Sequence, residues 1–269
     1  RGVLGRHENR KDTRRWDMGR MNIHGKLYFI SRYLHNRYVR RNSPSALPII
    51  LSLLVPRKAV VVDVGANVGD WVRAVNKSAP WRSRCICFEA NPALKIPPDL
   101  VSADVCWRNL ALGRAESVME LVIPSNHRLG FLKGDVDVEP GMEAVSVEVG
   151  LLDHVELARS NRVFLKIDVE GAEKLVIDGG LEFLKFKPCI FLETYEPFAQ
   201  RHGYSSKDVL TVLENLNYEI YWINTQERLS RIVPSELDEM PGIFSKYIDF
   251  LAIPKEQRLK NILARLILG

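Results

Sequence analysis

The feature that most constrains the fold is a run of apolar, largely β-branched residues that ends at a glycine. Lys58–Val64 is typical of a strand buried on both faces, and Gly65 follows it directly. Asp70–Ser78 then places apolar residues at helical spacing, and Pro80 lies just beyond. A buried strand, a glycine turn and a helix in this order indicate the first unit of a parallel α/β sheet.

The same alternation continues along the chain. Helical patterns cover Ala172–Asp178 and Lys207–Leu216, with Ser206 as the expected N-cap of the second. Between Ser117 and Val149 the pattern changes to period two, which predicts a β-hairpin insertion. We therefore expect a doubly wound, mainly parallel sheet with ligand sites at the carboxyl ends of its strands. The further expected strands are Arg84–Glu89, Cys106–Leu110, Val163–Asp168, Cys189–Thr194, Tyr218–Ile223 and Tyr247–Ile253.

Charge and patterning divide the chain into three parts. A basic, partly helical arm covers residues 1–45, the α/β domain covers 46–254, and a basic amphipathic helix covers 255–269. Within the arm, Arg1–Arg41 holds 12 Lys or Arg and three acidic side chains, a net charge of +9. Because the whole chain has a net charge of +5, the remaining residues carry a net charge of −4. A mildly acidic body argues against a nucleic-acid partner. The basic ends favour, at most, weak peripheral contact with an anionic membrane.

Two observations favour the cytoplasm, with the inner membrane face as the place for any peripheral contact. The longest uncharged apolar run, Ala46–Val55, is shorter than the roughly 18 residues that cross a bilayer. The four cysteines fall inside expected strands, where buried, reduced thiols are typical.

The glycine turn and the acid after the next strand point to a type of cofactor. Asn67 stands where a dinucleotide-binding turn needs its second glycine, and Asp63 would repel a pyrophosphate. A cofactor with a cationic amino-acid tail meets no such repulsion. Glu89 ends the second expected strand, where an acid accepts hydrogen bonds from both hydroxyls of an adenosine ribose.

With these residues in place, the chain resembles the FkbM-type methyltransferases, a branch of the class I S-adenosylmethionine-dependent enzymes, over roughly Val60–Glu196. The resemblance implies a Rossmann-like class I fold, S-adenosylmethionine as the cofactor, and O-methylation, often of a sugar or another hydroxylated natural product. The motifs that carry it are Val62–Gly69 (VDVGANVG), Phe88–Pro92 (FEANP), Asn109–Gly113 (NLALG), Leu151–Asp153 (LLD) and Leu165–Glu173 (LKIDVEGAE).

The resemblance also implies roles for single residues. The Gly65–Gly69 loop holds the methionine half of the cofactor, Glu89 binds the ribose, and Asn109 with Leu110 lies beside the adenine. The sequence departs from the family pattern at Ala90, which replaces a proline, and in a shortened Pro92–Val105 segment whose helix is expected to be truncated. The complete set expected to bind cofactor is Asp63, Gly65, Ala66, Asn67, Gly69, Glu89, Asn91, Asn109, Leu110 and Asp168.

Acidic residues at the ends of later strands are the catalytic candidates. Lys166 and Asp168 share one face of a strand, so a charged pair is aimed out of an otherwise apolar segment. Asp168, Glu170 and Glu193 are expected to carry catalysis, and Glu196 adds a carboxylate for orienting a substrate. Three roles stay open for them: accepting a hydroxyl proton, holding a sulfonium, or binding a divalent cation. No metal is part of the expected site, and a strand-end ion pair is the alternative for Lys166.

The sequence thus predicts an S-adenosylmethionine-dependent O-methyltransferase that acts on a hydroxyl of a sugar, glycolipid or other natural product. A nitrogen methyltransferase is disfavoured, because Ile167–Glu170 stands where many amine methylators carry Asn-Pro-Pro-aromatic. A catalytically silent module that binds the cofactor remains an alternative. An NAD-dependent oxidoreductase is opposed by the missing second glycine.

Overall fold

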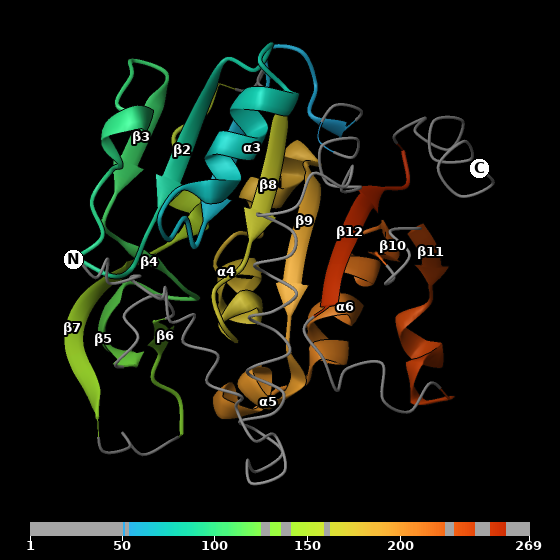
Figure 1. Cartoon of the computed structure of the whole chain (residues 1–269). Helices are drawn as coiled ribbons and strands as arrows, with labels where there is room; N and C mark the ends of the chain where they lie inside the picture. The colour runs from blue at the N-terminus through green and yellow to red at the C-terminus, as the bar shows by residue number, and fades with distance from the viewer. Residues whose placement is uncertain are drawn as a thin grey trace, which may run out of the picture. The chain divides into compact units, whose positions relative to one another are not determined.

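The computed structural model describes residues 51, 54–124, 130–135, 141–158, 162–223, 229–239 and 248–256. Figure 1 shows these residues as coloured ribbons. The basic arm and all but two residues of the basic C-terminal segment lie outside them. Among the described residues, no helix is long and apolar enough to cross a membrane.

Within the described residues, eight strands form the main sheet. In spatial order they are β11 (Leu229–Ile232), β10 (Tyr218–Ile223), β12 (Ile248–Pro254), β9 (Cys189–Thr194), β8 (Val163–Ile167), β1 (Val60–Val64), β2 (Arg84–Phe88) and β3 (Val105–Arg108). The five strands from β9 to β3 are parallel, whereas β12 is antiparallel to both β9 and β10. The expected mainly parallel sheet is confirmed. The order in which the chain adds strands reverses between β1 and β8, the place where ligands bind in such sheets.

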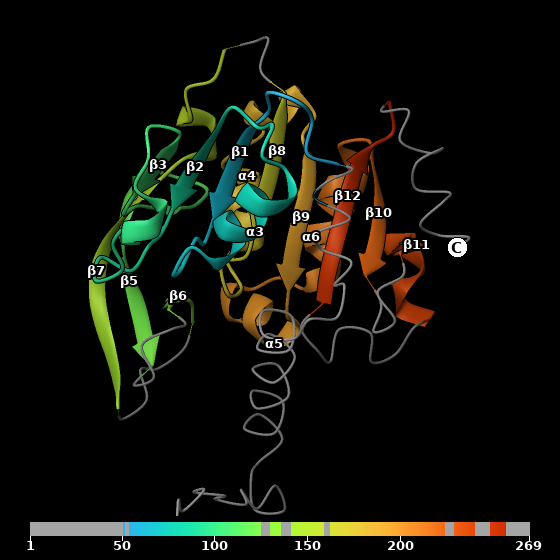
Figure 2. The same cartoon turned by 45° about the horizontal axis from the view of Figure 1, so that its top comes forward.

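Helices cover both faces of this sheet (Figure 2). The helix α3 (Asp70–Ser78) packs on one face together with Val61 of β1. The helices α4 (Glu173–Asp178) and α6 (Ser206–Asn215) pack on the other, where Val60, Val62 and Val64 point. Because alternate residues of β1 enter opposite cores, the strand is apolar on both faces except at Asp63, which is also buried. The four cysteines lie in β2, β3 and β9 as free thiols.

The expected hairpin is the core of a second sheet. Its four strands in the described part of the chain are, in order, β4 (Ala111–Leu112), β7 (Met142–Gly150), β5 (Ser117–Pro124) and β6 (Phe131–Leu132). The strands β5 and β7 are antiparallel, with Ser117 opposite Val149. Val147 and Val149 are buried while Ser146 and Glu148 are exposed, as the period-two pattern predicts. The buried face packs on Val169 and Ala172, which follow β8.

Two local details refine the sequence interpretation. Ser205, and not Ser206, caps α6: its hydroxyl accepts from the Asp208 amide at 3.1 Å, and the Asp208 carboxylate accepts from the Ser205 amide at 2.8 Å. Ser206 is instead buried, with its hydroxyl 2.9 Å from that of Thr194. The expected truncation after Pro92 is confirmed, because only a 3-10 turn, Pro98–Leu100, forms there.

Candidate active site

The glycine loop after β1 joins three strands at their carboxyl ends. The amides of Gly65 and Ala66 donate to the Phe88 carbonyl at 2.9 and 3.0 Å. Gly65 has φ +82°, and a Cβ there would lie 1.8 Å from the Asp168 carbonyl oxygen. Gly69 has φ +80°, and a Cβ there would lie 2.5 Å from a methyl group of Leu100. Only glycine lets the backbone turn and pack this closely.

Glu89 follows β2 and faces that loop. Its two carboxylate oxygens accept from the amides of Asn67 at 2.6 Å and Asn91 at 2.8 Å. Burial raises the pKa of Glu89, and these two hydrogen bonds oppose the rise. Each oxygen has a second lone pair, so a carboxylate fixed in this way can still accept from two hydroxyls. That property fits the ribose of an adenosine cofactor.

Asn109, which follows β3, shapes the loop between β2 and the 3-10 turn. Its side-chain amide donates to the carbonyls of Asn91 at 3.0 Å and Leu94 at 2.8 Å. The next residue, Leu110, packs half-buried against the core. Both lie at the same edge of the sheet as Glu89, and their expected place beside an adenine stays a prediction.

Lys166 forms a buried ionic triad with two of the predicted residues. Its ammonium lies 3.1 Å from Asp63 and 3.4 Å from Asp168, and it donates to the Gly65 carbonyl at 2.6 Å. Burial acts to lower the pKa of Lys166, but the two carboxylates outweigh it and the net shift is upward. Burial raises the pKa of Asp63, with Lys166 opposing. The expectation that Lys166 points out of the strand is wrong, because its side chain is only 4% exposed. The alternative, an ion pair between Lys166 and an acid, is confirmed by its contacts with Asp63 and Asp168.

Carboxylates gather at the ends of β8 and β9 and the start of β12. Glu193 of β9 lies directly opposite Asp249 of β12 in the strand register. Burial, followed by repulsion from Asp168, raises the pKa of Glu170 and Glu193 well above the ordinary value. The same two causes raise the pKa of Asp249 to about 7. The three predicted catalytic acids and Asp249 thus form one group, which we call the carboxylate edge (Asp168, Glu170, Glu193 and Asp249).

Asp249 was missed by the sequence interpretation. Its signal is a lone acid between Ile248 and Phe250 in an otherwise apolar strand. What the sequence does not reveal is the pairing of β12 with β9, which joins segments that lie far apart along the chain.

Two further acids hold the backbone. Glu173 is buried and accepts from the amides of Gly171 at 2.9 Å and Val169 at 3.3 Å. Glu196 accepts from the Ser206 amide at 2.7 Å and from Gln200 at 3.0 Å, so both of its oxygens are engaged between α5 (Glu196–Ala199) and α6. Among the described residues, no group of three or more His, Cys, Asp or Glu side chains is placed to hold a metal ion.

The fold and the site define a class. A doubly wound sheet, a glycine turn after β1, an acid after β2 and carboxylates at the ends of β8 and β9 are the parts of a Rossmann-like class I methyltransferase. The chain matches the model of the methyltransferase FkbM domain over residues 63–220. The chain therefore belongs to the FkbM methyltransferase family.

The solved structures to which the chain is similar are distant from it. An FkbM methyltransferase from Methylobacillus flagellatus is 13% identical, with a TM-score of 0.45; the match covers 75% of this chain and 47% of the other, about half its length. A precorrin-6y C5,15-methyltransferase from Geobacter metallireducens is 16% identical, with a TM-score of 0.41 and coverage of 78% and 87%. An S-adenosylmethionine-dependent O-methyltransferase from Thermotoga maritima is 12% identical, with a TM-score of 0.38 and coverage of 86% and 72%. A comparison with curated proteins finds no match.

Proposed function

We propose that the protein is an S-adenosylmethionine-dependent O-methyltransferase that methylates a hydroxyl of a sugar, glycolipid or other natural product. Its family supports methyl transfer, and the carboxylate edge supports oxygen as the acceptor atom. When bound, S-adenosylmethionine supplies an electrophilic methyl group on a positively charged sulfur. The residues that suit this cofactor are the Gly65–Gly69 loop, whose two glycines keep a left-handed backbone and pack closely on Asp168 and Leu100, and Glu89, whose lone pairs suit ribose hydroxyls.

Glu170 is the residue that we assign as the general base. One of its oxygens is buried and has no hydrogen-bond partner among the described residues, which leaves its lone pairs for a substrate hydroxyl. Burial and repulsion from Asp168 raise its pKa, which makes it a stronger base than an exposed carboxylate. Glu170 accepts the hydroxyl proton as the hydroxyl oxygen gains the methyl group. This unpartnered oxygen is the observation on which the proposal depends.

The neighbouring charges have separate tasks in this proposal. Lys166 holds Asp168 and neutralises Asp63, so that both acids stay in place beneath the glycine loop. Asp168 lies beside the loop through its contact with Lys166, where a carboxylate suits a cationic group. Glu193 and Asp249 lie next to each other and accept or donate hydrogen bonds to further hydroxyls of the acceptor.

The test uses the full chain, methyl-labelled S-adenosylmethionine, and polar-metabolite and glycolipid fractions as acceptors. Mass spectrometry should reveal products heavier by one labelled methyl group, and carbon NMR should identify a methyl ether. Glu170→Gln should abolish the product while S-adenosylhomocysteine binding persists. The control Glu182→Gln changes an exposed acid that pairs with the exposed Lys185 three residues further along the chain. An N-methyl product would refute the hydroxyl assignment, and equal product from the Glu170 variant would refute its role.

A further inference from the structure

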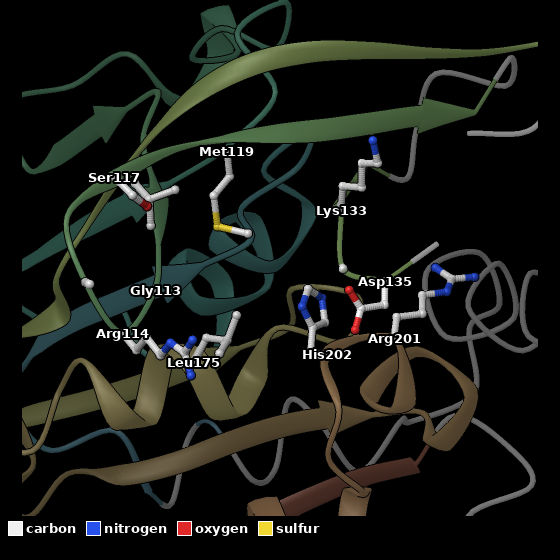
Figure 3. Close-up of a pocket in the computed structure, with 12 residues that line it drawn as sticks. Gly113, Arg114, Ser117, Met119, Lys133, Asp135, Leu175, Arg201 and His202 are labelled. Carbon is white, nitrogen blue, oxygen red and sulfur yellow. The ribbon is translucent and has the colours of Figure 1, made fainter. Parts of the chain in front are cut away.

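A pocket of about 480 Å³ lies between the second sheet, the helix α4 and the 3-10 turn Gln200–His202 that follows α5 (Figure 3). Met119 of β5 and Leu175 of α4 face each other across it, and His202 lies beside Asp135 toward one end, with Arg114 toward the other. Its size falls in the range of about 300–1,000 Å³ that is typical of small-molecule sites. Aliphatic walls with polar groups at the ends suit an amphipathic ligand.

The charged lining of this pocket has the opposite sign to the carboxylate edge. Three cations, Arg114, Lys133 and Arg201, line it with one acid, Asp135. Lys133 is paired with Glu120 at 2.6 Å, so its charge is largely balanced by that partner. The guanidinium of Arg201 lies over the rings of Phe131 and Phe198, at 4.3 and 3.9 Å from their centres. Arg114 is therefore the cation at which a negatively charged group is favoured, and such a group is disfavoured at the carboxylate edge.

His202 adds a hydrogen-bonding group. Its Nε2 is buried and has no partner within the described residues, and the ring also hydrogen-bonds the Leu132 backbone. Burial, and secondly the charge of Arg201, lower the pKa of His202. The imidazole is then neutral at pH 7, and its Nε2 offers a lone pair to a hydroxyl.

Arg201 connects this pocket to the carboxylate edge. Its positive charge acts to lower the pKa of Glu170, so the two residues are electrostatic neighbours. Its carbonyl accepts from the Asp135 amide at 2.8 Å, which fixes the pocket wall. A Cβ on Gly171 would lie 2.6 Å from the Phe198 carbonyl, so the turn after β8 packs directly on α5. The pocket and Glu170 are therefore carried by elements that pack directly on one another.

We propose that this pocket is a subsite for a hydroxylated ring that carries one anionic group, a carboxylate or a phosphate, and that this ring belongs to the methyl acceptor. In this proposal the ring packs between Met119 and Leu175. Its hydroxyls hydrogen-bond to His202 and Asp135, and its anionic group pairs with Arg114. The carboxylate edge repels the anion of the acceptor. The acceptor is therefore oriented with a neutral hydroxyl toward the carboxylate edge. This inference rests on the proposed function for the identity of the acceptor, but binding can be measured without turnover.

The pocket contains its own reporter, because Met119 is one of only five methionines in the chain. The full chain with labelled methionine methyl groups is saturated with S-adenosylhomocysteine and titrated with glucuronate, glucose 6-phosphate or glucose. The Met119 signal is assigned by its loss in Met119→Leu. It should shift with one or both charged sugars, more weakly with glucose, and less at high salt. If neither charged sugar moves it, or if glucose moves it equally, the inference is wrong.

A matched pair of variants locates the anion. Arg114→Gln should weaken binding of the charged sugar several-fold. Arg84→Gln, at the exposed start of β2 on the opposite edge of the sheet, should leave it unchanged. An Arg114 variant that binds like the original protein would overturn the assignment. If charged sugars bind at Met119 but no methyl ether forms, the proposed function is wrong and the subsite stands. If a methyl ether forms but no charged sugar binds at Met119, the subsite is wrong and the proposed function stands.

Discussion

Gly65 shows how one residue links the cofactor cradle to the catalytic edge. It combines a left-handed backbone with direct packing on the Asp168 carbonyl, so it has two separate reasons to be glycine. Gly203 has only the first reason: its φ is +77°, and a Cβ there would meet nothing within 4 Å. A substitution at Gly203 therefore measures backbone strain alone, whereas one at Gly65 measures strain together with the steric clash.

Gly65→Ala should weaken S-adenosylhomocysteine binding by about tenfold or more, equivalent to about 1.4 kcal/mol. The added Cβ pushes the loop away from the end of β8. Gly203→Ala should cost only the left-handed penalty of about 1–2 kcal/mol in stability, with unchanged affinity. Calorimetric titration and denaturant unfolding measure the two effects. Equal affinities in both variants would show that the loop does not touch the cofactor.

Lys166→Met should reduce the free energy of unfolding by about 3–5 kcal/mol at pH 7, because it leaves Asp63 buried without its cation. Without Lys166, the folded-state pKa of Asp63 rises further above its unfolded value. The variant should therefore be relatively most stable at acid pH and should lose stability as the pH rises toward 7. Lys174→Met, which breaks a pair with Asp178 of 2.7 Å near the surface, should cost only about 0.3–0.5 kcal/mol. Similar losses of stability in the two variants would contradict the burial of the Lys166–Asp63 pair, as would a stability of Lys166→Met that does not change with pH.

At the scale of elements, the turn after β8 holds the second sheet, α4 and the carboxylate edge together. Glu170 and Gly171 both have positive φ, 54° and 109°, and the buried Glu173 carboxylate accepts from two amides of the turn. Burial raises the pKa of Glu173 to about 7, so the folded chain binds this proton more tightly than the unfolded chain does. Its contribution to stability is fully present below about pH 4.5 and is lost as the pH rises through about 7.

Glu173→Gln should flatten this part of the pH profile. Glutamine cannot ionise, so the loss of stability between pH 5 and 8 should shrink by about 1–3 kcal/mol. Denaturant unfolding at several pH values measures it, with Glu116→Gln, an exposed acid, as the control. A Glu173→Gln profile as steep as that of the original chain would place the titration on another group.

The sequence predicts the local elements well, because each has its own signal. The bounds of α3, Asp70–Ser78, agree with the expectation, since an acidic start, apolar spacing and a following proline all act within that segment. Long-range pairing has no such signal. The approach of Asp249 to Glu193, and the inward turn of Lys166 to Asp63, depend on strands that are distant in the chain. The cap at Ser205 was misplaced by one residue because two serines are adjacent.

At the scale of the whole molecule, the charge is unevenly distributed along the chain. Acids gather at the ends of β8 and β9 and the start of β12, whereas Arg1–Arg41 carries a net charge of +9. We propose that the basic arm makes weak contact with anionic membranes in the cytoplasm, since each basic residue near such a surface contributes about 1 kcal/mol.

Removal of residues 1–20 should leave cofactor binding intact, because the predicted cofactor residues begin at Asp63. It should also reduce co-sedimentation with vesicles that contain phosphatidylserine, and added salt should do the same. Vesicles of phosphatidylcholine alone are the control. Full-length protein that stays in the supernatant with the anionic vesicles at low salt would refute the membrane contact.

The central claim is that the glycine loop and Glu89 bind an adenosyl cofactor of methyl transfer, and calorimetric titration tests it most directly. The full chain should bind S-adenosylhomocysteine at one saturable site and should give no heat with NAD. Glu89→Ala should weaken that binding by tenfold or more, because charge-assisted hydrogen bonds contribute about 1.5–3 kcal/mol each. Binding of NAD without any response to S-adenosylhomocysteine would contradict the claim.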